Sequence, residues 1–147
     1  MSKCFIDTNL IVYANDRSSG DRQQQAIDLV ATLIRQKAGA ISIQVLQEYA
    51  HVALTKLGQE SNVVIRQTRL LESLAVITPT PDMVRRSVEI RNAYQVSFWD
   101  ASIIAAAESA GCTVLLSEDL SANQFYASVQ VLNPFGSEFD LQSLLKN

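Results

Sequence analysis

Short apolar segments alternate along this chain with longer stretches of helical spacing, and this alternation limits the folds that the chain can adopt. The apolar segments have the length of buried β-strands, and they cover residues 2–6, 40–42, 75–77, 113–116 and 129–132. The helical patterns between them cover residues 20–37, 43–56, 61–74, 82–94 and 98–110. Strands that alternate with helices predict an α/β fold, a three-layer sandwich with a mostly parallel central sheet of about five strands.

Glycine, proline and serine residues mark the ends of several predicted helices. Gly39 is expected to stop the first long helix, and Gly111 the last one. Pro81 suits the first turn of the helix that follows it, because proline lacks a backbone N–H that has no partner there. Ser97 has the residue type of an N-cap for the last helix. Local residue chemistry therefore supports the helix boundaries that apolar spacing suggests.

The length of the chain, 147 residues, suits one domain with a sizeable core. We expect this domain to cover residues 1–135, followed by a C-terminal tail over 136–147. No apolar run reaches the ~18 residues of a membrane span. Asp7 and Asn9 interrupt any signal-type apolar segment near the N-terminus. The sequence therefore predicts a cytoplasmic protein that does not partner a membrane.

Several common functional classes lack their residues in this sequence. The only histidine, His51, lies mid-helix near no cysteine or serine motif, so a histidine-dependent hydrolase is not indicated and a surface role is expected. Neither the glycine pattern of dinucleotide-binding sites nor that of phosphate-binding loops occurs. Cys4 and Cys112 are isolated and are expected to be buried thiols. The net charge of −3 gives no overall attraction to nucleic acid, so phosphate contacts require a local patch or a metal.

Four carboxylates lie where the chain leaves buried structure: Asp7, Glu48, Asp100 and Asp119. Asp7 follows the first predicted strand, and Asp119 follows the fourth within three residues. Ligands of open parallel sheets bind beyond the carboxyl ends of strands, so these two acids are expected near a cleft. A buried carboxylate is costly unless it is paired, protonated or bound to a cation. Several acids that converge therefore suggest a site for a hard divalent metal.

Each of these carboxylates also has a purely structural interpretation. Asp7 is placed to cap the apolar stretch that follows it. Glu48 lies at the rim of a helix's apolar face, where its stem packs and its charge reaches water. Asp100 has the spacing of a capping box with Ser97, although Asp reaches back less well than Glu. Asp119 is compatible with a turn that caps the next segment. Their shared location, rather than any single acid, makes the case for a functional site.

These acids and their neighbours resemble the motifs of PIN-domain nucleases, in the same order along the chain. The resemblance extends over about residues 3–135 and includes the closing strand common in the VapC-type toxin branch. The motif segments are Phe5 to Asn9 (FIDTN), Ser42 to Tyr49 (SIQVLQEY), Phe98 to Ala107 (FWDASIIAAA), Leu115 to Leu120 (LLSEDL) and Val131 to Phe135 (VLNPF).

The resemblance implies a PIN fold and a Mg²⁺- or Mn²⁺-dependent endoribonuclease. It also implies the toxin of a type II toxin–antitoxin pair, with RNA as substrate and a small antitoxin protein as inhibitor. The family's acidic quartet carries over to four residues here, as catalytic and metal-binding groups: Asp7, Glu48, Asp100 and Asp119. Auxiliary polar roles carry over to Thr8, Asn9 and Ser117. A homodimer is the expected assembly.

Two other functions stay open at this point. One is a PIN nuclease of RNA processing that has no antitoxin, and the other is a catalytically inactive PIN-like scaffold. For the toxin, we expect an antitoxin segment to place a basic side chain near Asp7 and Asp100. Apolar grooves for the rest of that segment are expected around Val12, Tyr13, Leu46 and Tyr49. The two tyrosines are equally compatible with core or homodimer positions.

Overall fold

The computed structural model describes residues 3–146, which form a mostly parallel sheet between helices. The strands within this range are β1 (Cys4–Ile6), β2 (Gly39–Ser42), β3 (Ala75–Ile77), β4 (Val114–Leu116), β5 (Phe125–Tyr126) and β6 (Val129–Leu132). Their order across the sheet is β3-β2-β1-β4-β6-β5, and only the β5–β6 pair is antiparallel. The predicted fold class is confirmed, with the short β5 added to the strands expected from the sequence.

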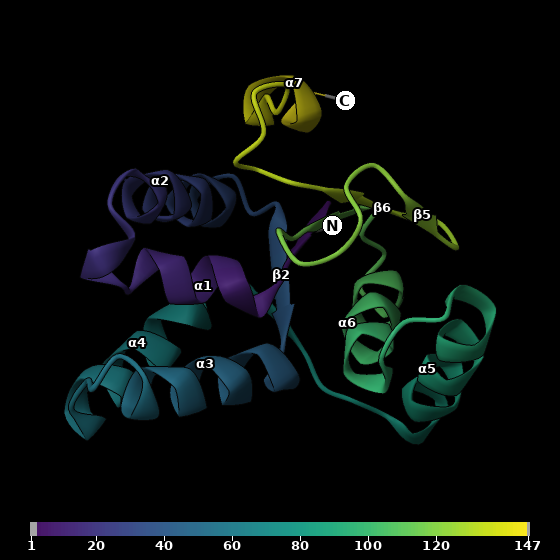
Figure 1. The fold of residues 1–147 in the computed structure, drawn as a ribbon, viewed down its shortest axis with the longest axis horizontal. Helices are drawn as coiled ribbons and strands as arrows, with labels where there is room; N and C mark the ends of the chain where they lie inside the picture. Colours follow the sequence, from purple (N-terminus) through teal and green to yellow (C-terminus); the bar gives the residue numbers. More distant parts are fainter. Residues whose placement is uncertain (1–2, 147) are drawn as a thin grey trace.

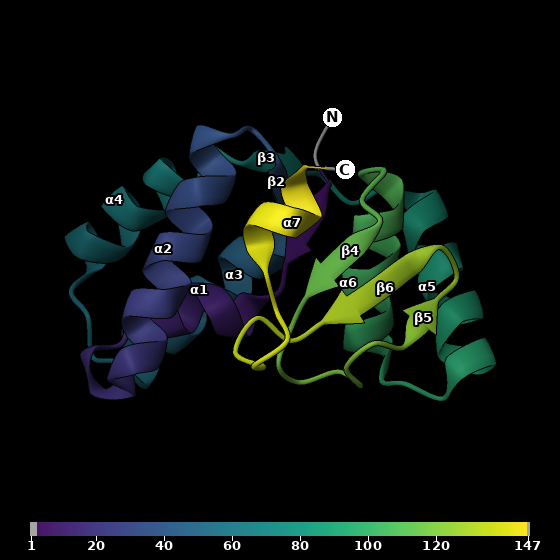
Figure 2. The same ribbon diagram turned by 90° about the horizontal axis from the view of Figure 1, so that it is seen from above.

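Helices cover both faces of this sheet, as Figures 1 and 2 show. On one side lie the helices that connect β1, β2 and β3; they are α1 (Thr8–Ala14), α2 (Asp21–Arg35), α3 (Ile43–Thr55) and α4 (Ser61–Leu71), with a 3₁₀ turn, η1, at Arg17–Ser19. On the other side lie α5 (Pro81–Tyr94) and α6 (Phe98–Ser109). The three-layer arrangement is therefore confirmed. The predicted first strand began at Ser2, which lies outside the described residues, as do Met1 and Asn147 of the predicted domain and tail.

The residues expected to start and stop the last two long helices do so. Pro81 is at the start of α5, where Thr80 caps the helix by accepting a hydrogen bond from the Met83 N–H. Ser97 caps α6, and its hydroxyl accepts from the Asp100 N–H at 3.0 Å. Gly111, just past the end of α6, has a φ of 74°, a conformation that glycine adopts without steric cost.

The role expected for Gly39 is wrong. Helix α2 ends at Arg35, and Lys37 takes the left-handed conformation with φ of 54°. Gly39 instead begins β2, where an added Cβ would lie 2.7 Å from Leu74 Cδ2 and 3.0 Å from Leu33 Cβ. Glycine is therefore required at this position because two core side chains approach the backbone closely.

The central strands have no solvent-facing side, as expected for a parallel sheet covered on both faces. Every residue of β1, β2 and β4 is buried. Cys4 and Cys112 are buried free thiols, which confirms that prediction, and burial raises the pKa of Cys4 to about 11. Among the described residues, no helix has both the length and the apolar content needed to span a membrane.

The segment after Phe135 adds the short helix α7 (Leu141–Leu145). Its side chains Leu141, Leu144 and Leu145 are partly buried against the core. The Lys3 ammonium donates to the Leu144 carbonyl at 2.6 Å, so this segment contacts the entry to β1.

The strand order reverses at the centre of the sheet, and this reversal positions the candidate site. The chain runs outward from β1 to β2 and β3, and then returns to place β4 on the other side of β1. Ile6 and Leu116, the last residues of β1 and β4, are paired neighbours. Asp7 and Ser117 follow them directly, at the point where ligands of such sheets bind.

Candidate active site

One cavity of about 310 Å³, which we call the acid cavity, opens beyond the carboxyl end of β1. It is lined by Asp7, Thr8, Asn9, Glu48, His51, Trp99, Asp100, Ile103 and Asp119. The four carboxylates singled out from the sequence therefore meet at one place, although they come from four separate segments of the chain. Of the expected auxiliary residues, Thr8 and Asn9 line the cavity, and Ser117 lies directly behind it.

Asp7 is the most buried of these acids, with only 7% of its surface exposed. It caps α1 by accepting from the Thr8 N–H at 2.7 Å, so the capping role considered from the sequence is confirmed. Its other oxygen accepts from the Ser117 hydroxyl at 2.7 Å. Capping and a site role coexist here, because the carboxylate lines the cavity while it holds both donors.

Burial raises the pKa of the Asp7 carboxyl to about 6. The hydrogen bonds from Ser117 and Thr8 oppose this rise, while the nearby negative charges of Asp119 and Glu48 add to it. Among the described residues no cation pairs with Asp7, so its charged form is destabilised in this structure. A positive group placed in the cavity would relieve this cost.

Ser117 connects the two central strands at the base of the site. It is fully buried, and its hydroxyl donates to Asp7 while accepting from the Asp119 N–H at 3.2 Å. The hydroxyl therefore fixes the turn that carries Asp119 to the carboxylate that ends β1. A serine or threonine is needed for this arrangement, since both a donor and an acceptor are used.

Glu48 extends into the cavity from the second turn of α3. One carboxylate oxygen accepts from the Thr8 hydroxyl at 2.6 Å, and the other accepts from the Gln44 amide at 3.4 Å. Gln44 also donates to the Trp99 carbonyl at 3.3 Å. These contacts join α1, α3 and the start of α6 around the cavity and hold Glu48 in one orientation.

Asp100 lies in the first turn of α6, with its backbone N–H bonded to the Ser97 cap. The Ser97 half of the capping box that the sequence spacing suggested is therefore confirmed. No hydrogen bond from the Asp100 side chain is present within residues 3–146, so the reciprocal half is not formed. The carboxylate is left facing the cavity. At a helix N-terminus a negative charge is also favoured by the helix dipole.

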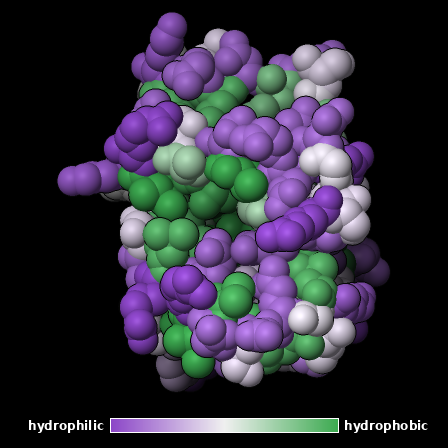
Figure 3. Space-filling view, turned by 90° about the vertical axis from the view of Figure 1, so that its left-hand side faces the viewer, coloured by the Kyte–Doolittle hydropathy of each residue, from purple (hydrophilic) through white to green (hydrophobic). Residues whose placement is uncertain are grey.

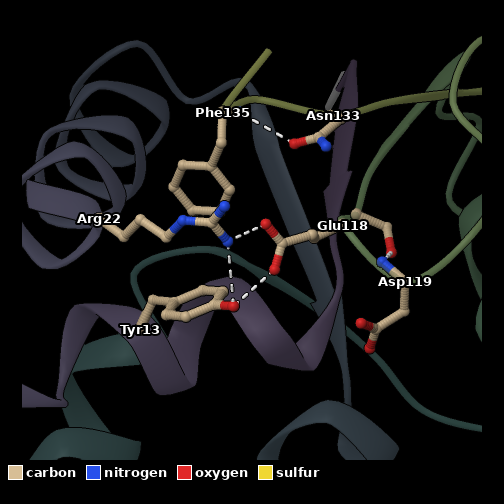
Figure 4. A network of polar contacts seen from close by, with 7 residues as sticks. Tyr13, Arg22, Glu118, Asp119, Asn133 and Phe135 are labelled. Carbon is tan, nitrogen blue, oxygen red and sulfur yellow. Dashed lines mark hydrogen bonds and ion pairs between the residues drawn. The ribbon is translucent and has the colours of Figure 1, made fainter. Parts of the chain in front are cut away.

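The two consecutive acids after β4 point in different directions (Figure 4). Glu118 is turned toward α1 and α2, where its carboxylate accepts from the Tyr13 hydroxyl at 2.5 Å and forms an ion pair with Arg22. The Arg22 guanidinium lies 4.9 Å from the centre of the Phe135 ring and 5.5 Å from that of Tyr13, a cation–π arrangement. This network, which we call the Glu118 anchor, leaves only Asp119 facing the cavity.

Asn9 presents an unsatisfied amide at the same place. Its side-chain oxygen and nitrogen are both buried without a hydrogen-bond partner in the described chain. A buried amide of this kind usually bonds to protein or ordered water. Because Asn9 lines the acid cavity, its amide is placed to bond to a group or water bound there.

The sequence did not indicate three of the lining residues. His51 was expected to have an ordinary surface role, and it is exposed, but it lines the cavity one helical turn after Glu48. Trp99 directly precedes Asp100, and Ile103 follows Asp100 by three residues. Helical spacing of three from a candidate acid was the signal that could have found His51 and Ile103.

The acids share one cavity without forming a tight cluster. Within residues 3–146, no three side chains of Asp, Glu, His or Cys lie close enough together to hold an ion by themselves. The cavity, with a volume of about 310 Å³, has room for several waters beside an ion. Such a site suits an ion that keeps part of its hydration shell and takes few carboxylates directly, as Mg²⁺ does.

Comparison with known proteins gives one family match. A family model described as the PIN domain matches residues 4–127, most of the chain. A search of the curated proteins found no match to this sequence.

Solved structures similar to this chain include several toxins. VapC20 from Mycobacterium tuberculosis, described as a sarcin–ricin loop cleaving toxin, is 22% identical over 80% of this chain and 90% of its own, with a TM-score of 0.66. A toxin–antitoxin complex from Klebsiella pneumoniae is 24% identical over 90% of this chain and 98% of its own, with a TM-score of 0.66. DNA-bound VapBC from Salmonella typhimurium is 18% identical over 89% of this chain and 97% of its own, with a TM-score of 0.67. At these identities the likeness shows a common fold.

Proposed function

Because this chain belongs to the PIN domain family, we propose that it is a Mg²⁺- or Mn²⁺-dependent endoribonuclease and the toxin of a type II toxin–antitoxin pair. The observation that carries the proposal is the meeting of four carboxylates in one cavity at the switch point of the sheet. No histidine-dependent nucleophile is required, because hydrolysis of a phosphodiester can rely on a metal and an oriented water.

The residues of the cavity fit a hard divalent cation. All four candidate acids, Asp7, Glu48, Asp100 and Asp119, offer oxygen ligands of the type that Mg²⁺ and Mn²⁺ prefer. Asp7 is buried without a cation, and the Asn9 amide lacks a partner, so both groups gain from an occupant. A bound ion supplies Lewis-acid chemistry to the phosphate and acidifies a water.

In this proposal Asp7 and Asp100 are the main metal ligands, and Glu48 and Asp119 complete the site or orient water. Ser117 and Thr8 hold two of these acids in place through the hydrogen bonds described above. Asn9 serves as an auxiliary polar group with a free amide. The carboxylates give the acid cavity a negative charge that repels phosphate, so RNA binding is coupled to metal binding.

A direct test is to incubate the purified protein with a pool of RNA. We expect cleavage with millimolar Mg²⁺ or Mn²⁺ and none when a chelator is in excess, because the carboxylates alone have no means to neutralise phosphate charge. Gel electrophoresis of end-labelled RNA measures the products, and single-stranded DNA of the same sequences serves as the substrate control. Cleavage that persists in chelator, or no cleavage under either condition, contradicts the nuclease proposal.

Metal binding should also raise the melting temperature. A ligand that binds only the folded state at a hundred times its Kd stabilises the protein by ~2.7 kcal/mol. We expect a shift of several degrees with Mn²⁺ and a smaller one with Mg²⁺, following the usual order of affinity. Thermal unfolding with and without each ion measures the effect, and the Asp7→Asn variant should show little shift. If neither ion shifts the wild type at millimolar concentration, with or without RNA, the metal site is contradicted.

The toxin assignment draws on the solved structures and on one surface. Two of the similar structures contain a toxin together with its antitoxin. Figure 3 shows apolar side chains around a hollow on the side of the molecule where α2 and α4 lie in Figure 1. Large exposed apolar residues of these two helices are Ile27, Val63, Ile65 and Leu70. We propose that an apolar segment of the antitoxin packs on this α2–α4 surface.

The groove expected around Val12, Tyr13, Leu46 and Tyr49 is wrong for Tyr49, while Val12 lines a cavity of about 760 Å³ beside α1 and α3. Tyr49 is fully buried in the core, and its hydroxyl donates to the side-chain amide oxygen Oε1 of Gln59 at 3.3 Å. Tyr13 is held in the Glu118 anchor. Val12 and Leu46 are partly buried against the core. Tyr49 packs inward, whereas Tyr13 is partly buried and contacts Glu118 and Arg22.

A PIN nuclease of RNA processing is the second candidate, because the same cavity serves either role. The gene next to this one separates the two, since a small basic partner encoded there favours the toxin. An inactive scaffold is disfavoured by the destabilised charge of Asp7, which a non-catalytic protein has no reason to keep. A homodimer and a cytoplasmic location remain predictions.

A further inference from the structure

We propose that a second cavity, next to the acid cavity, binds a nucleobase of the RNA strand being cleaved. The cavity has a volume of about 370 Å³ and lies between the starts of α3 and α6 and the first turns of α5. We call it the base pocket. Its volume falls within the range of pockets that bind small organic molecules, about 300–1,000 Å³. The inference rests on the proposed function for the identity of the strand.

Trp99 supplies a stacking surface at this pocket. Its side chain is 65% exposed, which is unusual for the largest apolar side chain in a protein of this size. The indole is held edge-to-face against the Phe98 ring, with centroids 5.2 Å apart and planes at 83°. An exposed aromatic ring that is fixed in place is the platform on which unpaired bases stack in proteins that bind single strands.

The walls of the base pocket suit the uncharged, flat part of a nucleotide. Met83, Phe98 and Ala106 contribute apolar surface. Trp99 is the one described lining residue that also lines the acid cavity, and the Gln44 amide reaches Glu48 there. No lining residue among them carries a charge, so the pocket attracts neither a phosphate nor a basic peptide. A planar aromatic ring remains the chemistry that fits.

Two polar side chains in the base pocket are available to the edge of a base. Gln47 is exposed on α3, and Ser102 is partly buried on α6. Neither side chain makes a hydrogen bond to another group in the part of the chain that the structure describes. An amide and a hydroxyl each offer a donor and an acceptor, which matches the mixed edges of nucleobases.

The base pocket shares a wall with the acid cavity. Trp99 lines both, and the Gln44 amide donates to Glu48 in one and to the Trp99 carbonyl between them. A phosphate at the acids and its neighbouring base at Trp99 can therefore belong to one strand. This shared wall favours a nucleobase of the bound strand as the occupant.

The sequence makes this proposal directly measurable, because Trp99 is the only tryptophan. Indole fluorescence therefore reports on the base pocket and on the wall that it shares with the acid cavity. We expect titration with the uncharged nucleosides adenosine, guanosine, cytidine and uridine to quench the emission of the full chain in a saturable manner, with at least one nucleoside effective. Ribose, which lacks a base, should leave the emission unchanged. Because nucleosides carry no phosphate, the titration does not depend on metal or on cleavage.

Kinetic variants test the same site in the RNA reaction. Trp99→Ala should lower kcat/KM for RNA roughly 5- to 150-fold, the factor that corresponds to ~1–3 kcal/mol of stacking, mainly through KM. Trp99→Phe should recover most of this loss. Phe125→Ala, which removes an equally exposed aromatic on β5, is the matched control and should have no effect. Melting temperature and size-exclusion chromatography are recorded for each variant.

The outcomes separate this inference from the proposed function. Saturable quenching by nucleosides, without RNA cleavage by the wild type, supports the base pocket and counts against the nuclease. RNA cleavage without quenching by any nucleoside, and with unchanged kinetics in Trp99→Ala, overturns the base pocket and leaves the nuclease intact. If Trp99→Ala converts a dimer to a monomer, a second copy covers the pocket and the nucleobase assignment is wrong.

Discussion

Replacing Asp7 by Asn is expected to abolish RNA cleavage while the fold survives and becomes more stable. Loss of a main metal ligand removes Lewis-acid assistance worth several kcal/mol. Because ~1.4 kcal/mol corresponds to a tenfold change in rate, activity should fall by roughly a hundredfold or more. Cleavage of labelled RNA at saturating Mg²⁺ or Mn²⁺ measures this effect. Asp100→Asn should cause a comparable loss.

The gain in stability follows from the direction of the Asp7 pKa. The carboxyl titrates near 3.8 when unfolded and about 6 when folded, so the folded state binds more protons between these values. Wild-type stability therefore falls as pH rises through this window, and the penalty is complete above it. At pH 7 without metal the penalty is ~3 kcal/mol. Asn keeps the capping oxygen and carries no charge. The melting temperature of the Asp7→Asn variant should therefore exceed that of the wild type by several degrees.

Two controls give this comparison its meaning. At pH 4 the stability gain should be absent, because the wild-type carboxyl is already mostly neutral in the folded state. Asp140→Asn changes a carboxylate that also caps a helix, α7, but hydrogen bonds from Ser143 and Gln142 lower the pKa of Asp140. That variant should gain no stability and should keep full activity. A folded Asp7→Asn protein that cleaves RNA at the wild-type rate removes Asp7 from catalysis.

The second large effect concerns inhibition by a partner. Co-expression with the product of the adjacent gene should yield a stable complex that cleaves RNA at least a hundredfold more slowly than the free chain. An arginine of the partner can bind the acids bidentately and occupy the position of the ion. Such a contact also offsets the charge penalty of Asp7. Co-purification followed by the labelled-RNA assay measures both binding and silencing.

Surface variants locate the partner. Leu70→Asp on α4 places a charge on the α2–α4 surface and should weaken the complex strongly without changing the activity of the free chain. Val88→Asp on α5, where the side chain has similar exposure, is the matched control and should leave the complex intact. A complex that cleaves RNA as fast as the free chain, or the absence of any complex, favours the RNA-processing function.

The sequence predicted the layers of the fold because its signals there are local. Apolar runs and helical spacing placed the main strands and helices, and the Ser97 cap and the Pro81 helix start were readable from residue type. Strand β5 was missed because its hairpin turns at Ala127, whose φ of 53° carries no glycine signal. The Ala127 N–H donates to the Tyr94 hydroxyl at 2.7 Å, a tertiary contact that sequence spacing does not reveal.

The candidate site was predictable in its acids and not in its surroundings. Asp7 and Asp119 follow strands that pair in the sheet, so their proximity follows from topology. The opposite orientations of Glu118 and Asp119 depend on Arg22, which is 96 residues away from Glu118. The partners of the acids and the pocket at Trp99 likewise arise from packing between distant segments. Such arrangements require the folded structure because no local pattern encodes them.

The hydrogen bond between Ser117 and Asp7 spans 110 positions of the chain. Its acceptor follows β1 and its donor follows β4, so the bond joins segments that are far apart in the sequence. Asp7, Glu48 and Asp100 all precede β4, the strand that pairs with β1 and leads into Asp119. Contacts of such long sequence separation form late in folding. On the proposed function, a chain that stops before Ser117 therefore lacks both the hydrogen bond that holds Asp7 and the turn that carries Asp119.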